Sequence, residues 1–178
     1  MPTDNAELKK FMNNAAKPQG ALGNKMIELM NEFHAPIWNW TLSHLTLDKT
    51  DNVIDLGCGD GVNVQRFLEI CDKVTGLDYS PLCVQKFRAK NSDAIRAGRC
   101  EIVEGNVSAM PFADNSTSGA NVFDDFVYGM KNRTAGEIVR LLRESNFTEI
   151  RTAVKTVEVD TKIFGKTVMD WLSVLAIK

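Results

Sequence analysis

The stretch VIDLGCGDG, residues 53–61, is the main evidence for the fold that we predict from this sequence. Its first part, Val53 to Leu56, is an apolar run interrupted only by Asp55, which is typical of a buried parallel strand. Residues 57–61 then alternate glycine with other residues. Glycine at alternate positions lets the backbone adopt positive φ angles and come close to a bound ligand. The stretch therefore predicts a strand followed by a ligand-binding turn.

A helix is expected directly after this turn, because apolar residues recur at helical spacing over residues 62–71. The first N–H groups of such a helix are free to bind something polar or anionic. A second apolar run, residues 74–77, ends at Asp78. An acid about 20 residues after a glycine turn is well placed to bind the hydroxyls of a ribose. The order of strand, turn, helix, strand and acid therefore favours a nucleotide-like ligand.

The pattern D-x-G-x-G-x-G over residues 55–61 resembles motif I of the class I S-adenosylmethionine-dependent methyltransferases. A dinucleotide fingerprint would instead need a glycine at Val62. The resemblance implies a Rossmann-like α/β fold with a mostly parallel sheet, an antiparallel C-terminal strand and a helical N-terminal extension. It also implies direct transfer of a methyl group from S-adenosyl-L-methionine to an acceptor, with S-adenosyl-L-homocysteine as product and no nucleophile from the protein.

The resemblance also implies a cofactor site built on the first two strands. Asp55 and the turn residues Gly57, Cys58 and Gly59 would hold the methionine end of the cofactor. Asp78, at the end of the second strand, would bind the ribose hydroxyls.

The adenine would lie between two further segments. Tyr79 would contact the adenine ring, and Asn106 and Val107 would lie at its edge. The last two belong to EGNVSAMPFADNS, residues 104–116, which resembles the family's segment G-D-A-x-x-L-P-F-x-D-x-S-F-D. Asn106 stands where the family has an acid. Its side-chain carbonyl can still accept a hydrogen bond from an amino group, without the charge assistance of a carboxylate.

Composition and charge are those of an ordinary globular protein. Of 178 residues, 44% are hydrophobic and 25% are charged, and the formal net charge is -2. Such a balance gives no electrostatic footprint for nucleic acid or for an anionic membrane. No apolar run approaches the ~18 residues of a membrane span. We therefore expect a small-molecule acceptor, with neither nucleic acid nor a membrane as partner.

The cysteines predict neither a metal site nor a disulfide framework. They are isolated from one another, with no C-x-x-C pair, and the chain has only two histidines. The polar N-terminus lacks the apolar core of a signal peptide. These features favour a reducing compartment, and we expect the protein to be cytoplasmic.

The whole chain, 1–178, is expected to form a single methyltransferase-like domain with three parts. Residues 1–47 form a helical extension or lid, residues 50–115 the cofactor-binding half, and residues 122–178 the C-terminal helices and strand pair. Within the extension, helices are predicted over 4–17, 22–33 and 37–45. Pro18 and Pro36 mark the two interruptions.

One segment of this extension, NEFHAPIWNW, holds Asn31, His34 and Trp40. It resembles the pattern M-N-x-x-H-x-x-x-x-x-W that precedes motif I in one bacterial branch of small-molecule methyltransferases. His34 is thus a candidate base toward an acceptor, or a candidate cofactor contact. The alternative is a structural histidine near a helix break, and the Met, Phe and Trp residues of the extension could likewise simply pack on the sheet.

The remaining elements are predicted from caps and apolar runs. Ser80 and Pro81 predict the start of a helix that ends at Gly98. A third strand is expected over residues 101–103, and a capping box, Thr134 to Glu137, predicts a late helix. Two further runs, residues 148–157 and 170–177, predict the C-terminal strand pair.

The family's fourth strand, the helix after it and the fifth strand have no counterpart in this prediction. Residues 116–121 are expected to form a polar link, and residues 122–130 a helix. Strand one would then have an open apolar edge, which is unstable in water. We therefore expect that edge to be filled. Three explanations are open: residues missing from the sequence, closure of the gap by the C-terminal strands, or pairing with a second copy as a homodimer.

Two alternatives to an active methyltransferase follow from the same observations. A chain that lacks much of the acceptor pocket could bind S-adenosylmethionine without catalysis. A nicotinamide-dinucleotide-binding protein is the other alternative, against which Val62 in the place of the third glycine weighs.

Overall fold

The computed structural model describes residues 11, 13–43, 45–106, 109, 111–112, 119–122, 135–144, 149–161 and 165–177. Residues 13–16 are helical, and five further helices follow in this part of the chain: α2 (Gly20–Leu42), α3 (Val62–Leu68), α4 (Pro81–Lys90), α5 (Ser92–Arg96) and α6 (Ala135–Glu144). The strands are β1 (Asn52–Leu56), β2 (Lys73–Asp78), β3 (Cys100–Glu104), β4 (Gly119–Val122), β5 (Glu149–Thr161) and β6 (Gly165–Ile177).

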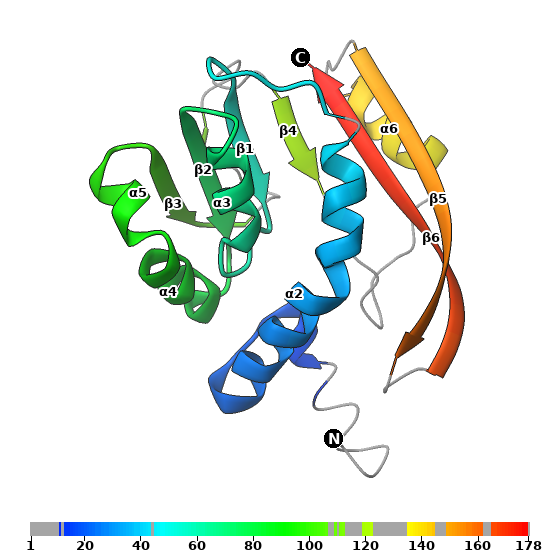
Figure 1. The fold of residues 1–178 in the computed structure, drawn as a ribbon, viewed down its shortest axis with the longest axis horizontal. Helices are drawn as coiled ribbons and strands as arrows, with labels where there is room; N and C mark the ends of the chain where they lie inside the picture. Colours follow the sequence, from blue (N-terminus) through cyan, green and yellow to red (C-terminus); the bar gives the residue numbers. More distant parts are fainter. Residues whose placement is uncertain are drawn as a thin grey trace.

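The strands form one sheet in the order β3-β2-β1-β4-β6-β5 (Figure 1). β1 pairs in parallel with β2 and β4, and β2 pairs in parallel with β3. β6 is antiparallel to both β4 and β5. This arrangement confirms the expected Rossmann-like sheet with an antiparallel C-terminal strand. Because β1, β2 and β3 run the same way, their carboxyl ends meet at one edge, where ligands of open α/β sheets bind.

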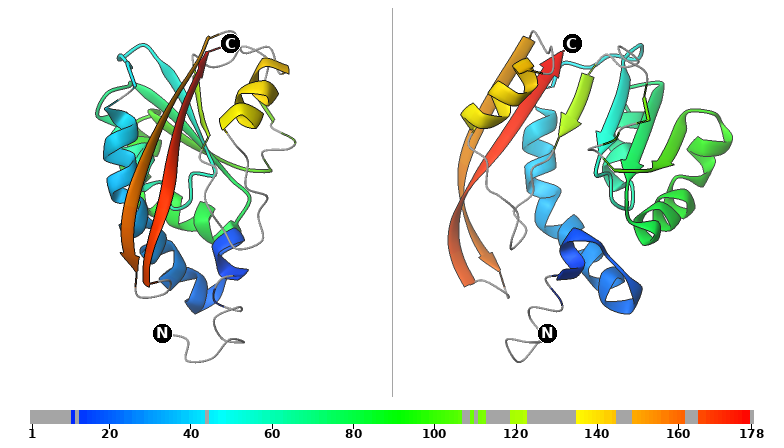
Figure 2. Two further views of the ribbon diagram at one scale, coloured as in Figure 1. Left: turned by 90° about the vertical axis from the view of Figure 1, so that its right-hand side faces the viewer. Right: turned by 180° about the vertical axis from the view of Figure 1, so that it is seen from behind.

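Helices cover both faces of this sheet (Figures 1 and 2). α2, α3, α4 and α5 lie on one face, and α6 lies on the other. On the first face, Trp38 of α2 packs edge-on against Phe67 of α3, with ring centroids 5.7 Å apart. Both residues belong to the buried apolar core. α2 is therefore an integral part of the core on the side of the sheet that carries the glycine turn.

α2 runs without interruption through Pro36, so the predicted break at that residue is wrong. Proline removes one backbone hydrogen bond and clashes with the preceding turn, but burial of the residues that follow can outweigh this cost. Ile37 and Trp38 are both buried. The helix changes direction between its two halves (Figure 1), as expected for a helix that contains proline. Met26 is buried, whereas Leu22 is 38% exposed, so the predicted apolar face begins later than expected.

The edge of β1 beside β4 is filled, as expected, but by a segment that the sequence predicted to be a polar link. Residues 119–122 form β4, and its register sets Asp55 of β1 opposite Asn121. The prediction of a link over 119–121, and of a helix beginning at Val122, is wrong. The rest of that predicted helix and residues 116–118 lie outside the described residues.

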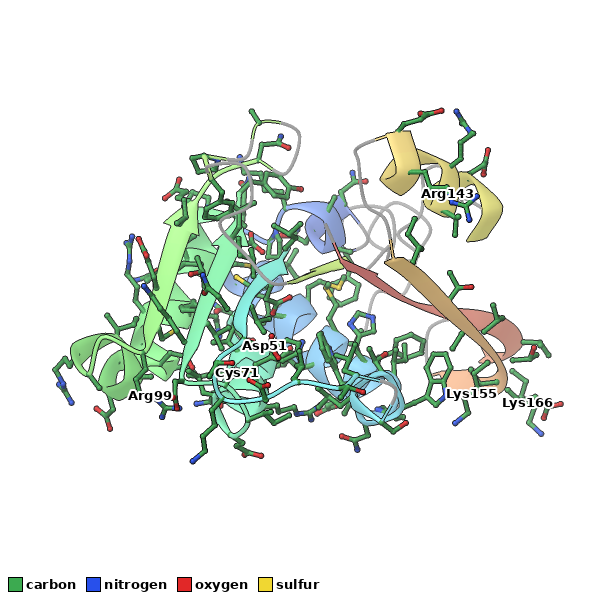
Figure 3. The ribbon with its side chains drawn as sticks, turned by 90° about the horizontal axis from the view of Figure 1, so that it is seen from above. Asp51, Cys71, Arg99, Arg143, Lys155 and Lys166 are labelled. Carbon is green, nitrogen blue, oxygen red and sulfur yellow. The ribbon has the colours of Figure 1, made fainter. Side chains whose placement is uncertain are left out.

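The C-terminal strand pair is confirmed, and both strands are longer than predicted. β5 and β6 pair from Glu149↔Ile177 to Thr161↔Gly165. Only two residues of β6 pair with β4, so most of this hairpin extends beyond the rest of the sheet (Figure 2). Lys155 and Lys166 extend from its far part (Figure 3).

The predicted helix over 81–98 is present as two helices, α4 and α5, separated at Asn91. Its start is confirmed, because the Ser80 hydroxyl accepts a hydrogen bond from the Cys83 N–H and Pro81 is the first helical residue. Gly98 has a φ angle of 71° after α5, as expected for a helix stop. No helix in the described part of the chain is both long and apolar enough to cross a membrane.

At the opposite edge of the sheet, where the parallel strands begin, Arg99 forms hydrogen bonds to the end of α3 and to the segment between α3 and β2. Its guanidinium donates hydrogen bonds to the carbonyl oxygens of Leu68 and Cys71, at 2.7 and 3.1 Å, and to that of Asp72. Arg99 and Cys71 lie close together beside Asp51, at the amino ends of the parallel strands (Figure 3). A cation that binds carbonyls released at the end of α3 stabilises that helix terminus. This edge is therefore occupied by structural contacts, whereas the carboxyl edge carries the glycine turn.

Candidate functional site

The glycine turn after β1 divides into an open half and a packed half. Gly57, Gly59 and Gly61 have φ angles of 75°, 56° and 76°. A side-chain carbon at Gly57 or Gly59 would meet no atom of the described residues within 4 Å. At Gly61 it would lie 2.4 Å from Phe87 and from Asn91. The first two glycines therefore leave room for a ligand against the backbone, and the third allows α4 to pack closely.

Backbone hydrogen bonds hold this turn against the end of β2. The N–H groups of Gly57 and Cys58 both donate to the carbonyl oxygen of Leu77, at 2.8 and 3.1 Å. The Gly61 N–H donates to the Cys58 carbonyl at 3.0 Å. The loop after β3 joins the same edge, since the Gly105 N–H donates to the Asp78 carbonyl. The turn is thus preformed.

Asp78 closes the same arrangement through its side chain. One carboxylate oxygen accepts from the Gly59 N–H at 2.9 Å, and the other accepts from the Ser80 N–H at 2.8 Å. Burial raises the pKa of Asp78, while these two hydrogen bonds lower it. Each carboxylate oxygen can accept more than one hydrogen bond. Asp78 can therefore hold the turn and still accept a hydrogen bond from a ligand hydroxyl.

Asp55 lies beneath the turn, 2% exposed, and one of its carboxylate oxygens finds no hydrogen-bond partner among the described residues. Burial, and secondarily the charge of Asp78, raise the pKa of Asp55 to about 7. Burial and the neighbouring Asp55 also raise the pKa of the Cys58 thiol, which therefore stays protonated. A buried carboxyl without a donor is a place for a cationic or N–H-bearing ligand group, or for a water that bridges to one.

Tyr79 follows Asp78 and is 41% exposed. Its hydroxyl donates to the Ala16 carbonyl oxygen, and the Lys17 ammonium lies 5.4 Å from the ring centroid. The next residue, Ser80, donates from its hydroxyl to the Pro18 carbonyl oxygen at 3.0 Å. The segment just before α2 is therefore attached to the end of β2, beside the position expected for adenine.

Asp60 is a site residue that the sequence interpretation missed. It is 5% exposed, and the Asn31 amide of α2 donates to both of its carboxylate oxygens, at 3.1 and 3.0 Å. Lys90, in the last turn of α4, forms an ion pair with it. The sequence offered one signal for Asp60, which is its position between two glycines of the turn. Its partner Asn31 had been singled out in the segment 31–40, but not its contact with Asp60.

The structure brings most of the predicted cofactor residues to one edge of the sheet, but not all can be placed. Asn106 follows β3 and is exposed. Its backbone carbonyl oxygen accepts a hydrogen bond from the Ala109 N–H. Val107 lies outside the described residues. His34 lies half-buried on α2 and packs edge-on against Phe33, with centroids 5.4 Å apart. That contact fits the structural alternative for His34.

The edge fits S-adenosylmethionine in three respects. Gly57 and Gly59 leave an open cradle, Asp55 has an unsatisfied oxygen beneath it, and the exposed Tyr79 ring lies next to Asp78. An aminoacyl group with an ammonium, a ribose and a planar base would each meet a suitable protein group.

Comparison with known proteins agrees with this geometry. Residues 53–145, just over half of the chain, match the family model described as "Methyltransferase domain". O-methyltransferase cnsE of Penicillium expansum is 30% identical over 95 residues, which cover 52% of this chain and 34% of that protein. The Probable ribosomal RNA small subunit methyltransferase A of Natronomonas pharaonis is also 30% identical, over 53% of this chain and 32% of the relative. The chain thus spans about a third of these relatives.

Solved structures resemble the fold over a larger share of the chain. The YcgJ protein of Bacillus subtilis superposes with a TM-score of 0.56 at 10% identity, covering 82% of this chain and 99% of that one. At this identity the likeness concerns the fold alone. This likeness of fold agrees with the strand order described above, and the family match over residues 53–145 includes the glycine turn. The chain belongs to the methyltransferase domain family and has the class I S-adenosylmethionine-dependent methyltransferase fold.

Proposed function

We propose that this chain is an S-adenosylmethionine-dependent methyltransferase that acts on a small-molecule acceptor. The observation that carries the proposal is the open cradle over Gly57 and Gly59, with the unsatisfied oxygen of Asp55 beneath it. The formal net charge of -2 favours a small acceptor over a nucleic acid. The four cysteines are buried and unpaired, which fits a reducing cytoplasm.

In this proposal each residue binds one part of the cofactor. Asp55 receives the ammonium of the methionine part, directly or through a water, while Gly57 and Gly59 let its chain lie against the backbone. Asp78 accepts a hydrogen bond from a ribose hydroxyl. Tyr79 packs against the adenine ring.

We assign contacts with the edge of the adenine ring to the loop after β3. Asn106 accepts from the adenine amino group there, and Val107 is proposed to contact the same edge.

The bound cofactor supplies an electrophilic methyl group on a sulfonium. The residues of this chain bind and orient that group and exclude water, so that the lone pair of an acceptor atom would attack the methyl carbon while the carbon–sulfur bond breaks, with S-adenosylhomocysteine as the leaving group. The Asp78 carboxylate fixes the turn and the ribose together, because it holds the Gly59 N–H and the Ser80 N–H at once. No protein nucleophile is needed.

We predict that Asp78→Ala weakens binding of S-adenosylmethionine by about 1–3 kcal/mol, the scale for loss of hydrogen bonds to a charged group. Isothermal calorimetry measures the affinity. Asp93→Ala, which removes an aspartate that is 88% exposed on α5, is the matched control and should bind like the parent. Equal affinity of Asp78→Ala and the parent would reject this site assignment.

The same calorimeter separates the alternatives. The parent protein should bind S-adenosylmethionine and S-adenosylhomocysteine and should show no heat with a nicotinamide dinucleotide. Heat with the dinucleotide alone would overturn the proposal. Binding of S-adenosylmethionine without turnover, in a screen of small hydroxyl, amine and thiol acceptors, would favour a binding module without catalysis.

A further inference from the structure

Asp60 joins three separate elements at the glycine turn. It lies between Gly59 and Gly61, and only 5% of its surface is exposed. The Asn31 amide reaches both carboxylate oxygens from α2, and the Lys90 ammonium lies 2.5 Å from one of them at the end of α4. The two partners are 29 and 30 residues away from Asp60 along the chain. None of the cofactor contacts proposed above uses this carboxylate.

A buried carboxylate needs such partners, and losing one of them is costly. An ion pair removed from water repays its desolvation only when additional hydrogen bonds satisfy the remaining lone pairs. Lys90 provides the charge, and its side chain remains 31% exposed. Asn31 provides the second partner on both oxygens. The contact with α2 is therefore part of what makes the buried Asp60 tolerable in the turn.

α2 is also attached at the other end of the proposed cofactor site. Just before the helix, Ala16 and Pro18 accept hydrogen bonds from Tyr79 and Ser80. Gly23, in the first turns of α2, allows close packing against Pro18 and Leu82, since a side-chain carbon there would lie 2.7 Å from the Pro18 backbone. The helix thus spans from the end of β2 to the turn after β1.

From these contacts we propose that Asp60 is a positioning residue, and that the cluster Asn31–Asp60–Lys90 holds α2 across the glycine turn as one wall of the cofactor site. The inference rests on the proposed function. It assigns to Asn31 a specific task, which is to fix α2 to the turn through the Asp60 carboxylate. While the contact between Asn31 and Asp60 is intact, α2 stays against the turn and completes the wall of the cofactor site beside Gly57 and Gly59.

An exchange of side chains tests the pair. Asn31→Asp sets two carboxylates against each other and is expected to weaken binding of S-adenosylhomocysteine about tenfold in calorimetry. It should also speed trypsin cleavage after Lys25, an exposed residue of α2, followed by mass spectrometry. The double variant Asn31→Asp/Asp60→Asn restores one amide and one carboxylate beside Lys90. It should return both measurements to within about threefold of the parent.

Asn24→Asp is the matched control, because it makes the same substitution on the same helix. Within the described residues, the hydrogen bond of the Asn24 amide goes to the Gly20 carbonyl of its own helix, at 3.2 Å. Both measurements should equal those of the parent. If Asn31→Asp does not fold, Asn31→Ala removes the contact without repulsion and is expected to weaken binding about fivefold.

The outcomes separate this inference from the proposed function. If Asn31→Asp binds S-adenosylhomocysteine as tightly as the parent, or if the double variant binds it no more tightly than Asn31→Asp, the role of Asp60 is overturned. A parent that does not bind the probe at all would reject the proposed function instead. Trypsin cleavage after Lys25 would then decide alone: rescue in the double variant supports the attachment of α2, and absence of rescue rejects it.

Discussion

Replacing Gly59 with Val is expected to abolish binding of S-adenosylmethionine, while the protein still unfolds in one cooperative transition. A first side-chain carbon at Gly59 would meet no atom within 4 Å in the part of the chain that the structure describes, so a side chain there would fill the volume where the ligand approaches the backbone. The φ angle of 56° adds a conformational cost of about 1–2 kcal/mol. Calorimetry and thermal unfolding measure the two effects separately.

Gly98→Val is the matched control for this variant. Gly98 has a φ angle of 71° and also faces open space, but it precedes β3 at the opposite edge of the sheet. It should show a similar loss of stability and unchanged cofactor affinity. Unchanged affinity of Gly59→Val would mean that the turn is structural, and the proposed site would lose its main support.

Gly61→Ala should behave in the opposite way, with a large loss of stability. Its new carbon would lie 2.4 Å from the Phe87 ring and from the Asn91 amide, which donates to the Gly61 carbonyl. Overpacking costs about 1–3 kcal/mol, and the left-handed backbone adds about 1–2 kcal/mol. Gly59→Ala carries the backbone cost alone. Equal unfolding free energies for the two alanine variants would contradict the division of the turn into an open half and a packed half.

The second large effect is expected at Asp55, whose buried carboxyl should make the protein less stable as the pH rises. Burial raises the pKa of Asp55 to about 7 in the folded protein, from an ordinary value of 3.8. The folded state therefore binds the proton more tightly than the unfolded state, and stability falls between pH 4 and pH 7. The loss amounts to about 4 kcal/mol in all, of which about 3 kcal/mol falls between pH 5 and pH 8.

Asp55→Asn should remove this dependence. The difference in unfolding free energy between variant and parent, measured with urea, should shift by about 3 kcal/mol in favour of the variant from pH 5 to pH 8. Asp93→Asn, at an exposed position, is the control and should leave the slope of the parent unchanged. A parental slope that persists in Asp55→Asn would show that another group is responsible.

The sequence predicted the half of the sheet whose signals are local. β1, β2 and β3 each contain a short apolar run. The residue types at Ser80 and at the turn glycines are enough to predict a helix cap and positive φ angles at those positions. β4 could not be predicted in this way. Three of its four residues, Gly119, Ala120 and Asn121, have low strand propensity, and they form a strand because β1 and β6 offer hydrogen-bonding edges on both sides.

The proposed cofactor site could be predicted from sequence as far as its residues lie next to the turn or at a strand end. Asp55 and Asp78 were nominated by their spacing from the turn glycines and by the resemblance to motif I, and their roles toward the cofactor stay predictions. Asp60 was missed because its role depends on Asn31 and Lys90, which only the fold brings together. The continuous α2 was missed for a similar reason, since burial of Trp38 against Phe67 outweighs the local effect of Pro36.

The short strand β4 has a consequence for the order in which this protein folds. Its partners are distant along the chain, because Asn121 pairs with Asp55, 66 residues earlier, and with Leu175, 54 residues later. The β5–β6 hairpin closes locally, and hairpins form in about 1–10 μs. Pairing across β4 must first close two long loops, so it is slow relative to either half. We therefore expect the two parts of the sheet to form independently and to join last, at β4.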